Sequence, residues 1–329
     1  MLKFPFVSNY SLVNNECRFY FSAKLGIILI LRRAYMKNLY YIVLILIVST
    51  VITGCGNKVK SDINDYKAQM KDVQSEEKKL VQQIDDLGLD KADQLLGAEV
   101  TEEKKKKLKK IELDINEKIK PQLKAYEKKV MAVKPDTKEV KDVHNIYVRN
   151  LNKKKQFISE LDRYMKLFNQ SIQSNEKILE YTKVFEKNNA LNEKYAKKAV
   201  RNSEDFDTLT KLVNNNSDVL KEKVTYLTSS GSVNEKQAYI DETLIPLLKA
   251  NVDKLNQTKL KSKNVIGMRK ATIETYYSLI NYYKERKVAM KTESELQKLP
   301  IQNILENTKY IKSIDEKYYD ALNSLEAKQ

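Results

Sequence analysis

The chain has 329 residues, 60 of them basic and 44 acidic, and a formal net charge of +16. A single histidine and two cysteines are too few for a histidine-rich metal site, a four-cysteine zinc site or a disulfide framework. Only seven glycines are present and none forms a phosphate-binding loop, so the composition favours a non-enzymatic protein without a cofactor or a metal site.

An apolar stretch at residues 39–52 (LYYIVLILIVSTVI) follows a short basic start at residues 36–38. This order is typical of a secretory signal peptide, and the stretch is short for a membrane span. We therefore expect residues 36–54 to be a signal peptide and residues 1–35 to be an upstream extension from a miscalled start codon. In the alternative, the apolar residues 26–31 belong to a longer leader or to a second segment that touches the membrane.

The next four residues, Ile52-Thr53-Gly54-Cys55, resemble the lipobox of bacterial lipoproteins, in which an aliphatic and two smaller residues precede an obligatory cysteine. The resemblance implies that signal peptidase recognises Ile52, Thr53 and Gly54, and that Cys55 carries a covalent diacylglyceryl lipid. Two acyl chains suffice for stable membrane attachment. In the alternative, residues 39–52 remain as an uncleaved anchor and Cys55 is an ordinary thiol.

After Cys55, apolar residues recur every three or four positions and nothing alternates as in a strand, which predicts an all-α fold. Glu77 interrupts the first apolar stripe and is expected at its solvent edge. The stripe consists of Ile63, Tyr66, Met70, Val73, Leu80, Ile84 and Leu87.

A second helix is predicted to begin after the N-cap Thr101, with Glu102 and Glu103 in its first turn. Pro121 lies inside the pattern and predicts a kink or a break, since proline lacks the backbone N–H. Residues 135–136 (Pro-Asp) mark the next boundary. The apolar stripe comprises Leu108, Ile111, Ile115, Ile119, Leu123, Tyr126, Val130 and Val133.

A third stripe keeps heptad-like spacing over about 40 residues, which corresponds to a rod of roughly 60 Å. Lys154 and Asn175 fall on the same seam, where they either limit slippage of the partner helix or face water. We expect residues 55–188 to form an elongated antiparallel helical bundle with a coiled-coil-like body. The stripe comprises Val140, Val143, Tyr147, Leu151, Ile158, Leu161, Met165, Phe168, Ile172 and Leu179.

Residues 189–329 are predicted to form a second helical region, with one continuous helical body as the alternative. Breaks are expected at residues 214–217 (NNNS) and 229–232 (SSGS). The helices expected after them cover residues 234–263, interrupted by Pro246, then 268–291 and 292–326.

The C-terminal end contains adjacent tyrosine pairs at residues 276–277, 282–283 and 318–319. Tyrosines among lysines can form a stacking surface for sugars or nucleic acid. We favour the simpler interpretation that one tyrosine of each pair packs inward, because helical spacing links Ile273, Tyr277, Ile280 and Lys284.

The positive charge suits anionic lipid headgroups and phosphate-bearing wall polymers. Nucleic acid is not expected as a partner, since only eight of the 60 basic residues are arginine. The lysine runs at residues 104–107 and 153–155 are predicted to be solvated helix faces, and His144 is predicted on a helix surface.

Near the C-terminus, Glu316-Lys317-Tyr318-Tyr319 resembles the signature of the EMYY-motif lipoproteins, with Lys317 where that family has methionine. Residues 63–133, a helix, a glycine-containing break and a lysine-rich second helix, are similar to the cell-wall-binding lipoproteins of bacilli. Both resemblances imply an exported, lipid-anchored, helical protein of a Gram-positive bacterium. Neither brings a known reaction.

We therefore expect a lipoprotein on the extracellular face of the cell membrane, with a non-enzymatic binding or spacer role in the envelope. The expected partners are the membrane, through the lipid anchor, and anionic wall polymers or another protein. One alternative is the small-ligand receptor of a transporter, although such receptors need two mixed lobes around a cleft. Another is an anchored coiled-coil partner of a membrane machine.

Overall fold

The computed structural model describes the backbone of residues 40–89, 100–201, 203–300, 311 and 313–329, with side chains from residue 58 onward in these ranges. Regular structure in these ranges is entirely helical, which confirms the predicted all-α fold. Two π-helices, η2 (Ile115–Ile119) and η4 (Ile240–Leu244), and a 3-10 helix, η3 (Thr225–Thr228), accompany the α-helices. The α-helices are α1 (Tyr40–Asp85), α3 (Glu102–Asp114), α4 (Lys120–Ala132), α5 (Lys138–Lys198), α6 (Glu204–Val224), α7 (Val233–Tyr239), α8 (Ile245–Gln257), α9 (Lys263–Gln297) and α11 (Glu316–Glu326).

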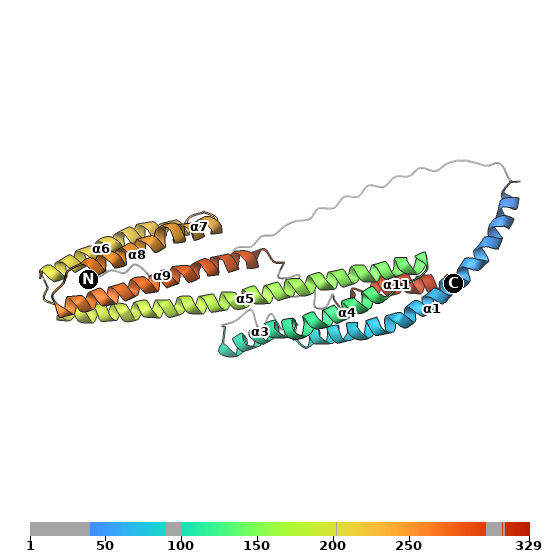
Figure 1. Ribbon diagram of the computed structural model, residues 1–329, viewed down its shortest axis with the longest axis horizontal. Helices are drawn as coiled ribbons and strands as arrows, with labels where there is room; N and C mark the ends of the chain where they lie inside the picture. Colours follow the sequence, from blue (N-terminus) through green and yellow to red (C-terminus); the bar gives the residue numbers. More distant parts are fainter. Residues whose placement is uncertain (1–39, 90–99, 202, 301–310, 312) are drawn as a thin grey trace, which may run out of the picture.

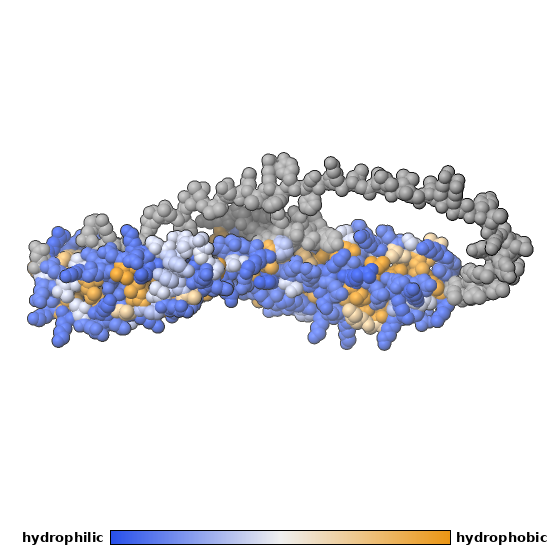
Figure 2. All heavy atoms as spheres, turned by 90° about the horizontal axis from the view of Figure 1, so that it is seen from above, coloured by the Kyte–Doolittle hydropathy of each residue, from blue (hydrophilic) through white to orange (hydrophobic). Residues whose placement is uncertain are grey.

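The helices form an elongated bundle around α5, which has 61 residues and is therefore about 90 Å long (Figure 1). Helix α9 runs antiparallel to the C-terminal half of α5, and α6, α7 and α8 pack against α9. Along the N-terminal half of α5 lie α1, α3, α4 and α11. Figure 2 shows a mostly hydrophilic surface along the length of this body.

Buried apolar side chains form two clusters, one in each half of the molecule. The first cluster joins α1, α3, α4, α11 and the N-terminal half of α5. The second joins α6, α8, α9 and the C-terminal end of α5. The predicted division between residues 188 and 189 lies inside α5, which runs without interruption from one cluster to the other.

The predicted apolar stripes build the first cluster. All residues of the first stripe are buried, and so are most of the second and third, with Leu123, Phe168 and Ile172 packed partly buried against them. The prediction was wrong for Leu179, which is 61% exposed. In this part of α5 the partner is α9 instead of α1 and α3, so the buried face has turned by one residue to Ile178.

Both prolines that were expected to interrupt helices lie where a π-helix interrupts the α-helix, while the chain as a whole stays helical and does not break. Helix η2 leads directly to Pro121, and η4 leads directly to Pro246. In η2 the N–H of Lys120 donates to the carbonyl of Ile115, five residues back. This wider turn makes room for the proline ring and for the carbonyl that proline cannot pair.

Of the two breaks predicted in the C-terminal region, one is present. Residues 229–232 separate η3 from α7, and Ser232 and Glu235 form a capping box at the start of α7. The break predicted at residues 214–217 was wrong, because these residues lie inside α6. Asn216 continues the buried stripe of Leu209, Val213 and Leu220, and this apolar spacing outweighs the low helix propensity of asparagine.

The starts of α3 and α5 are fixed by side-chain oxygens. Thr101 Oγ1 accepts the N–H of Lys104 at 3.3 Å, which confirms the predicted cap. At α5 the carboxylate of Asp62, in α1, accepts the N–H groups of Asp136 (3.0 Å) and Thr137 (2.7 Å) and the hydroxyl of Thr137 (2.6 Å). Burial alone would raise the pKa of Asp62, but these bonds hold it below its ordinary value. Asp62 thus fastens α1 to the N-terminal end of α5.

Candidate functional site

The four motif residues open α11, and one of them is fully buried. Glu316 and Lys317 are exposed, Tyr319 is 42% exposed, and Tyr318 is buried. The carbonyl of Asp315 accepts the N–H groups of Tyr318 (3.0 Å) and Tyr319 (3.1 Å), which fixes the first turn of α11. The motif therefore turns one tyrosine into the core and leaves the rest accessible.

Tyr318 completes a set of four buried tyrosines contributed by α1, α4, α5 and α11. Its ring lies edge to face against that of Tyr147, with 4.8 Å between centroids, and Tyr147 meets Tyr126 in the same manner at 6.2 Å. Such pairs contribute about 0.5–1.5 kcal/mol each beyond the burial of their area. The fourth member is Tyr66, and all four side chains are fully buried.

Beside these rings lie three charged side chains, Glu77, Lys154 and Asp315, which we call the ionic cluster. Glu77 belongs to α1 and Lys154 to α5, and Asp315 is the residue before α11. Their side chains are 12%, 1% and 9% exposed. The Lys154 ammonium donates to Oε1 of Glu77 and to Oδ2 of Asp315. One lysine thus joins three elements that are far apart in the sequence.

The remaining oxygens of the two carboxylates have partners of their own. The Tyr147 hydroxyl donates to Oε2 of Glu77 at 2.7 Å, and the Asn150 amide donates to Oδ1 of Asp315 at 2.9 Å. The Lys154 ammonium also lies 5.5 Å from the ring centroid of Tyr126 and 5.6 Å from that of Tyr147. These distances are within the range of cation–π attraction.

The ionic cluster sets two acids against one base in a site removed from water. Burial raises the pKa of Glu77 to about 7 and the neighbouring Asp315 adds to the rise, while Lys154 opposes it. Below neutral pH Glu77 therefore holds a proton. Burial, Tyr126 and Glu77 also raise the pKa of the Tyr147 hydroxyl, which stays a donor.

The expectation that Glu77 lies at a solvent edge was wrong. Its carboxyl group is one of two acidic partners of the buried Lys154, and an unpaired buried charge would be very costly. Of the two roles weighed for Lys154, the structure supports the fixing of register. Sliding α1 or α11 along α5 would leave a buried charge without its partner. We interpret the ionic cluster as a docking contact that holds α11 in one register.

His144 was predicted on the surface, and this prediction was wrong. Its ring is buried and lies edge to face against Tyr66, with 5.7 Å between centroids. Its Nδ1 atom is 3.4 Å from the Tyr66 hydroxyl. Burial lowers the pKa of His144, so the ring is neutral at physiological pH. His144 is adjacent to the buried Val143 in α5, and its ring packs against Tyr66 of α1.

The tyrosine pairs divide as the packing interpretation predicted. Tyr276, Tyr283 and Tyr318 are buried, whereas Tyr277 and Tyr319 are exposed. The helical stripe drawn through Tyr277 was displaced by one residue, because the α9 face against α5 and α8 carries Tyr276 instead.

The lysine runs are largely paired within the protein. Lys105 contacts Glu102 and Glu176, Lys107 contacts Glu103 at 3.0 Å, and Lys155 contacts Glu127 at 2.5 Å. Lys154 belongs to the ionic cluster, so the prediction of a solvated face was wrong for that residue. The structure instead gathers Lys284, Lys287 and Lys291 beside a groove, a set that the analysis of the sequence missed. Their spacing of three and four residues along one helix was the available signal.

The residues of the predicted lipobox lie in the first part of α1, where only the backbone is described. The side chains of Ile52, Thr53, Gly54 and Cys55 are outside the described residues, and so is the predicted extension at residues 1–35. Among the residues that the structure describes, no helix has the length and apolar character to cross a membrane.

Residues near Cys55 and the motif helix meet at the same end of the molecule. Lys67 in α1 pairs with Glu326 in α11 at 2.7 Å, and Tyr66 and Tyr318 share one aromatic set. Cys55, the anchor candidate, and Glu316, the first residue of the predicted motif, are 261 positions apart in the sequence. Helix α1 links these two parts of the chain. Asp315 was not singled out from the sequence, where its only signal is its position before the motif.

Comparison with known proteins identifies one family. The model of the EMYY-motif containing lipoproteins matches residues 36–326, so the match starts at Met36, the first residue of the predicted signal peptide, and includes α11. No curated protein and no solved structure matches the chain.

Proposed function

The chain belongs to the EMYY-motif containing lipoproteins, and we propose that a lipid on Cys55 holds it at the extracellular face of the cell membrane. There its helical body has a non-enzymatic binding or spacer role. Residues 36–54 act as the signal peptide, and Ile52, Thr53 and Gly54 are the residues that the peptidase recognises. Diacylglyceryl attachment supplies the two acyl chains that stable anchoring requires.

The contact of Asp62 with the start of α5 is the observation that carries this proposal. Asp62 follows Cys55 by seven residues and bonds to the N–H groups of Asp136 and Thr137. A lipid on Cys55 would therefore sit near one end of a helix about 90 Å long. Val59, four residues after Cys55, is already buried. This close coupling of anchor and rod suits a spacer better than a receptor on a long flexible tether.

Metabolic labelling with a clickable fatty acid tests the anchor. We expect the wild-type protein to carry the label and to begin at Cys55 when its N-terminus is read by mass spectrometry. Cys55→Ala should lose both the label and the cleavage. Cys17→Ala is the matched control, since it removes the other cysteine of the chain and should leave both unchanged.

Two outcomes would contradict the proposal. Retention of the apolar residues 39–52 in an unlabelled wild-type protein would mean that the segment anchors the chain itself. Label that survives in Cys55→Ala would mean that the lipid is attached elsewhere. In either case the role of Cys55 would have to be abandoned, whereas the helical body described above would be unaffected.

A further inference from the structure

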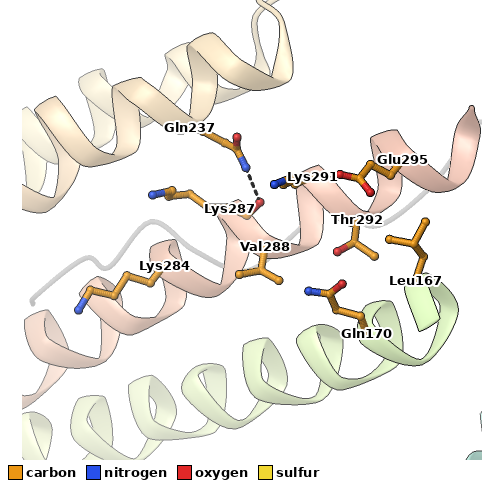
Figure 3. A pocket seen from close by; sticks show the side chains of 9 residues that line it. All are labelled: Leu167, Gln170, Gln237, Lys284, Lys287, Val288, Lys291, Thr292 and Glu295. Atoms are coloured by element: carbon orange, nitrogen blue, oxygen red, sulfur yellow. Dashed lines mark hydrogen bonds between the residues drawn. The ribbon is translucent and has the colours of Figure 1, made fainter. Parts of the chain in front are cut away.

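A groove between α5, α7 and α9 carries chemistry that the docking of α11 does not use. It has a volume of about 440 Å³, within the range of small-ligand sites. Lys284, Lys287 and Lys291 line it from α9, where steps of three and four residues bring them to one side of the helix. Figure 3 shows Gln170 of α5 and Gln237 of α7 on the other sides of this space.

The groove has an excess of positive charge. Lys287 contacts Asp241, whereas Lys284 and Lys291 are exposed and have no ion pair within the described part of the chain. Glu295 is the acid that lines the groove, and it already lies 3.6 Å from Arg163. Lys284 and Lys291 therefore remain available to an anion. A bound anion would also relieve the mutual repulsion of the three ammonium groups.

Other side chains give the groove a defined shape. The Gln237 amide donates to the carbonyl of Lys287 at 2.9 Å, which fixes α7 against α9 as one wall (Figure 3). Leu167 and Val288 supply an apolar surface, and the buried Thr292 lies beside them. Such a lining accepts short carbon chains between charged groups, with the amides of Gln170 and Gln237 available for hydroxyl groups.

The arrangement of the lysines favours phosphodiesters over a single small anion. The three ammonium groups are distributed over seven residues of α9, or about 10 Å, so they can meet successive charges along a chain. Ammonium groups act as point charges and bind phosphate without the two-pronged geometry that arginine offers to carboxylates. The ligand class that fits is a polymer of small polyols linked by phosphodiesters.

We infer that this groove binds a polyol phosphodiester chain through Lys284, Lys287 and Lys291. The choice of a wall polymer over the headgroups of the anchoring membrane rests on the proposed function. With Cys55 held at the bilayer, Leu167 and Gln170 lie roughly 45 Å along α5 from its anchored end. Headgroups of that bilayer would be out of reach of an upright rod.

Binding of poly(glycerol phosphate) to the purified full-length chain in detergent micelles tests the inference. By isothermal titration calorimetry, Lys284→Gln/Lys291→Gln should bind at least tenfold more weakly than wild type. The slope of log affinity against log salt should fall by about two, one for each lost contact. Lys284→Arg/Lys291→Arg keeps both charges and should bind within about threefold of wild type.

The matched control is Lys124→Gln/Lys128→Gln, which removes the same charge from α4. Both lysines are exposed and make no ion pair among the described residues. This variant should bind as wild type does. A wild-type protein that fails to bind the polymer, or equal losses in the groove and control variants, would overturn the inference.

Two further arms identify the source of the phosphate. Vesicles of phosphatidylglycerol should bind the groove variant and the control variant equally, and inorganic phosphate should bind wild type far more weakly than the polymer does. Selective loss of vesicle binding in the groove variant would assign the groove to headgroups and overturn the polymer. These measurements do not depend on lipidation, so their failure is distinguishable from failure of the labelling experiment.

Discussion

The ionic cluster makes Lys154 the most consequential single residue of the N-terminal half. It is the buried cation that contacts both Glu77 and Asp315, and its ammonium lies over two tyrosine rings. A buried ion pair gains little net stability over an apolar pair, but it penalises every arrangement that separates its members. Substitutions here should therefore affect both stability and its dependence on pH.

Glu77→Gln should flatten the pH dependence of stability. Folding raises the pKa of Glu77 to about 7, so between pH 4.5 and 7 the folded chain holds a proton that the unfolded chain has lost. This contribution is present below pH 4.5 and is lost as the pH rises through 7. The contribution of Glu77 to the free energy of unfolding should thus fall by about 2–3 kcal/mol between pH 5 and pH 8 in the wild type.

Urea unfolding at the two pH values measures this effect. Glutamine mimics the protonated acid at every pH, so the variant should lose the slope and exceed the wild type in stability at pH 8. Glu117→Gln removes an exposed carboxylate of η2 and should keep the wild-type slope. An unchanged slope in Glu77→Gln would show that another group titrates.

Lys154→Met should cost about 3–5 kcal/mol of unfolding free energy, because it leaves two buried carboxylates without their cation. Lys153→Met, at the exposed neighbouring position, should change the value by less than about 0.5 kcal/mol. Chemical unfolding at pH 7 compares the two. Equal stability of both variants would mean that water already screens the cluster.

The sequence predicted part of this site. The motif residues were found by resemblance, and inward packing of one tyrosine in each pair follows from helical spacing. The partner of Lys154 could not be found in this way, because Asp315 is 161 residues away along the chain. Periodicity defines which face of a helix is buried and carries no information on which distant polar residue meets it.

Among the helices, α11 is short and is attached by few groups. Tyr318 packs on Tyr147, Asp315 contacts Lys154, and Glu326 pairs with Lys67. An isolated helix of 11 residues is unstable in water, so its helicity depends on this docking. Tyr318, one residue of the predicted family motif, is thus among the groups that attach this C-terminal helix to the body.

Tyr318→Ala should release α11 while the rest of the bundle stays folded. Loss of a buried aromatic side chain costs about 3–5 kcal/mol, more than an 11-residue helix can replace by other contacts. Amide hydrogen exchange should show lost protection in α11 and retained protection in α8 and α9. Tyr319→Ala, which truncates the exposed tyrosine, should keep α11 protected. Loss of protection in both variants would contradict the role of Tyr318.

The long helices were predicted better than the connections between them. Apolar stripes indicated α1, α3, α4 and α5 because each buries one face along its length. The π-helices before Pro121 and Pro246 were not predicted, since the backbone can meet a proline by breaking or by widening one turn. At each proline the helices on both sides remain packed in the bundle, and the chain takes the wider turn instead of a break.

The whole molecule is a rod whose two ends differ. One end holds the start of the body after Cys55 together with α11, and the other is formed by the connections from α5 to α6 and from α8 to α9 (Figure 1). At that second end Asp205 accepts the N–H groups of Lys261 and Ser262 at 2.7 and 2.5 Å. The rod is therefore closed by turns of the chain and not by a terminus.

If Cys55 anchors an upright rod, fluorophores at its two ends should respond differently to the bilayer. With the protein reconstituted in vesicles, a dye on Gln329→Cys should be quenched strongly by nitroxide lipids. A dye on Lys259→Cys, in the far connection, should be quenched weakly because about 90 Å of α5 lies between. With residues 1–54 removed and the Cys55 thiol lipidated, the introduced cysteine is the thiol that each dye labels. Equal quenching at both positions would indicate that the rod lies flat.

The closed far end has a consequence for engineering. If Cys55 carries the lipid, a peptide fused to the C-terminus would lie close to the bilayer, where antibodies and enzymes reach it poorly. An epitope inserted between Gln257 and Lys259 would instead lie at the far end, on the loop that joins α8 and α9, and these two helices pack directly against each other. If Cys55 carries the anchor, an interior loop of the chain, and not a terminus, is therefore the position for presenting a fused sequence away from the membrane.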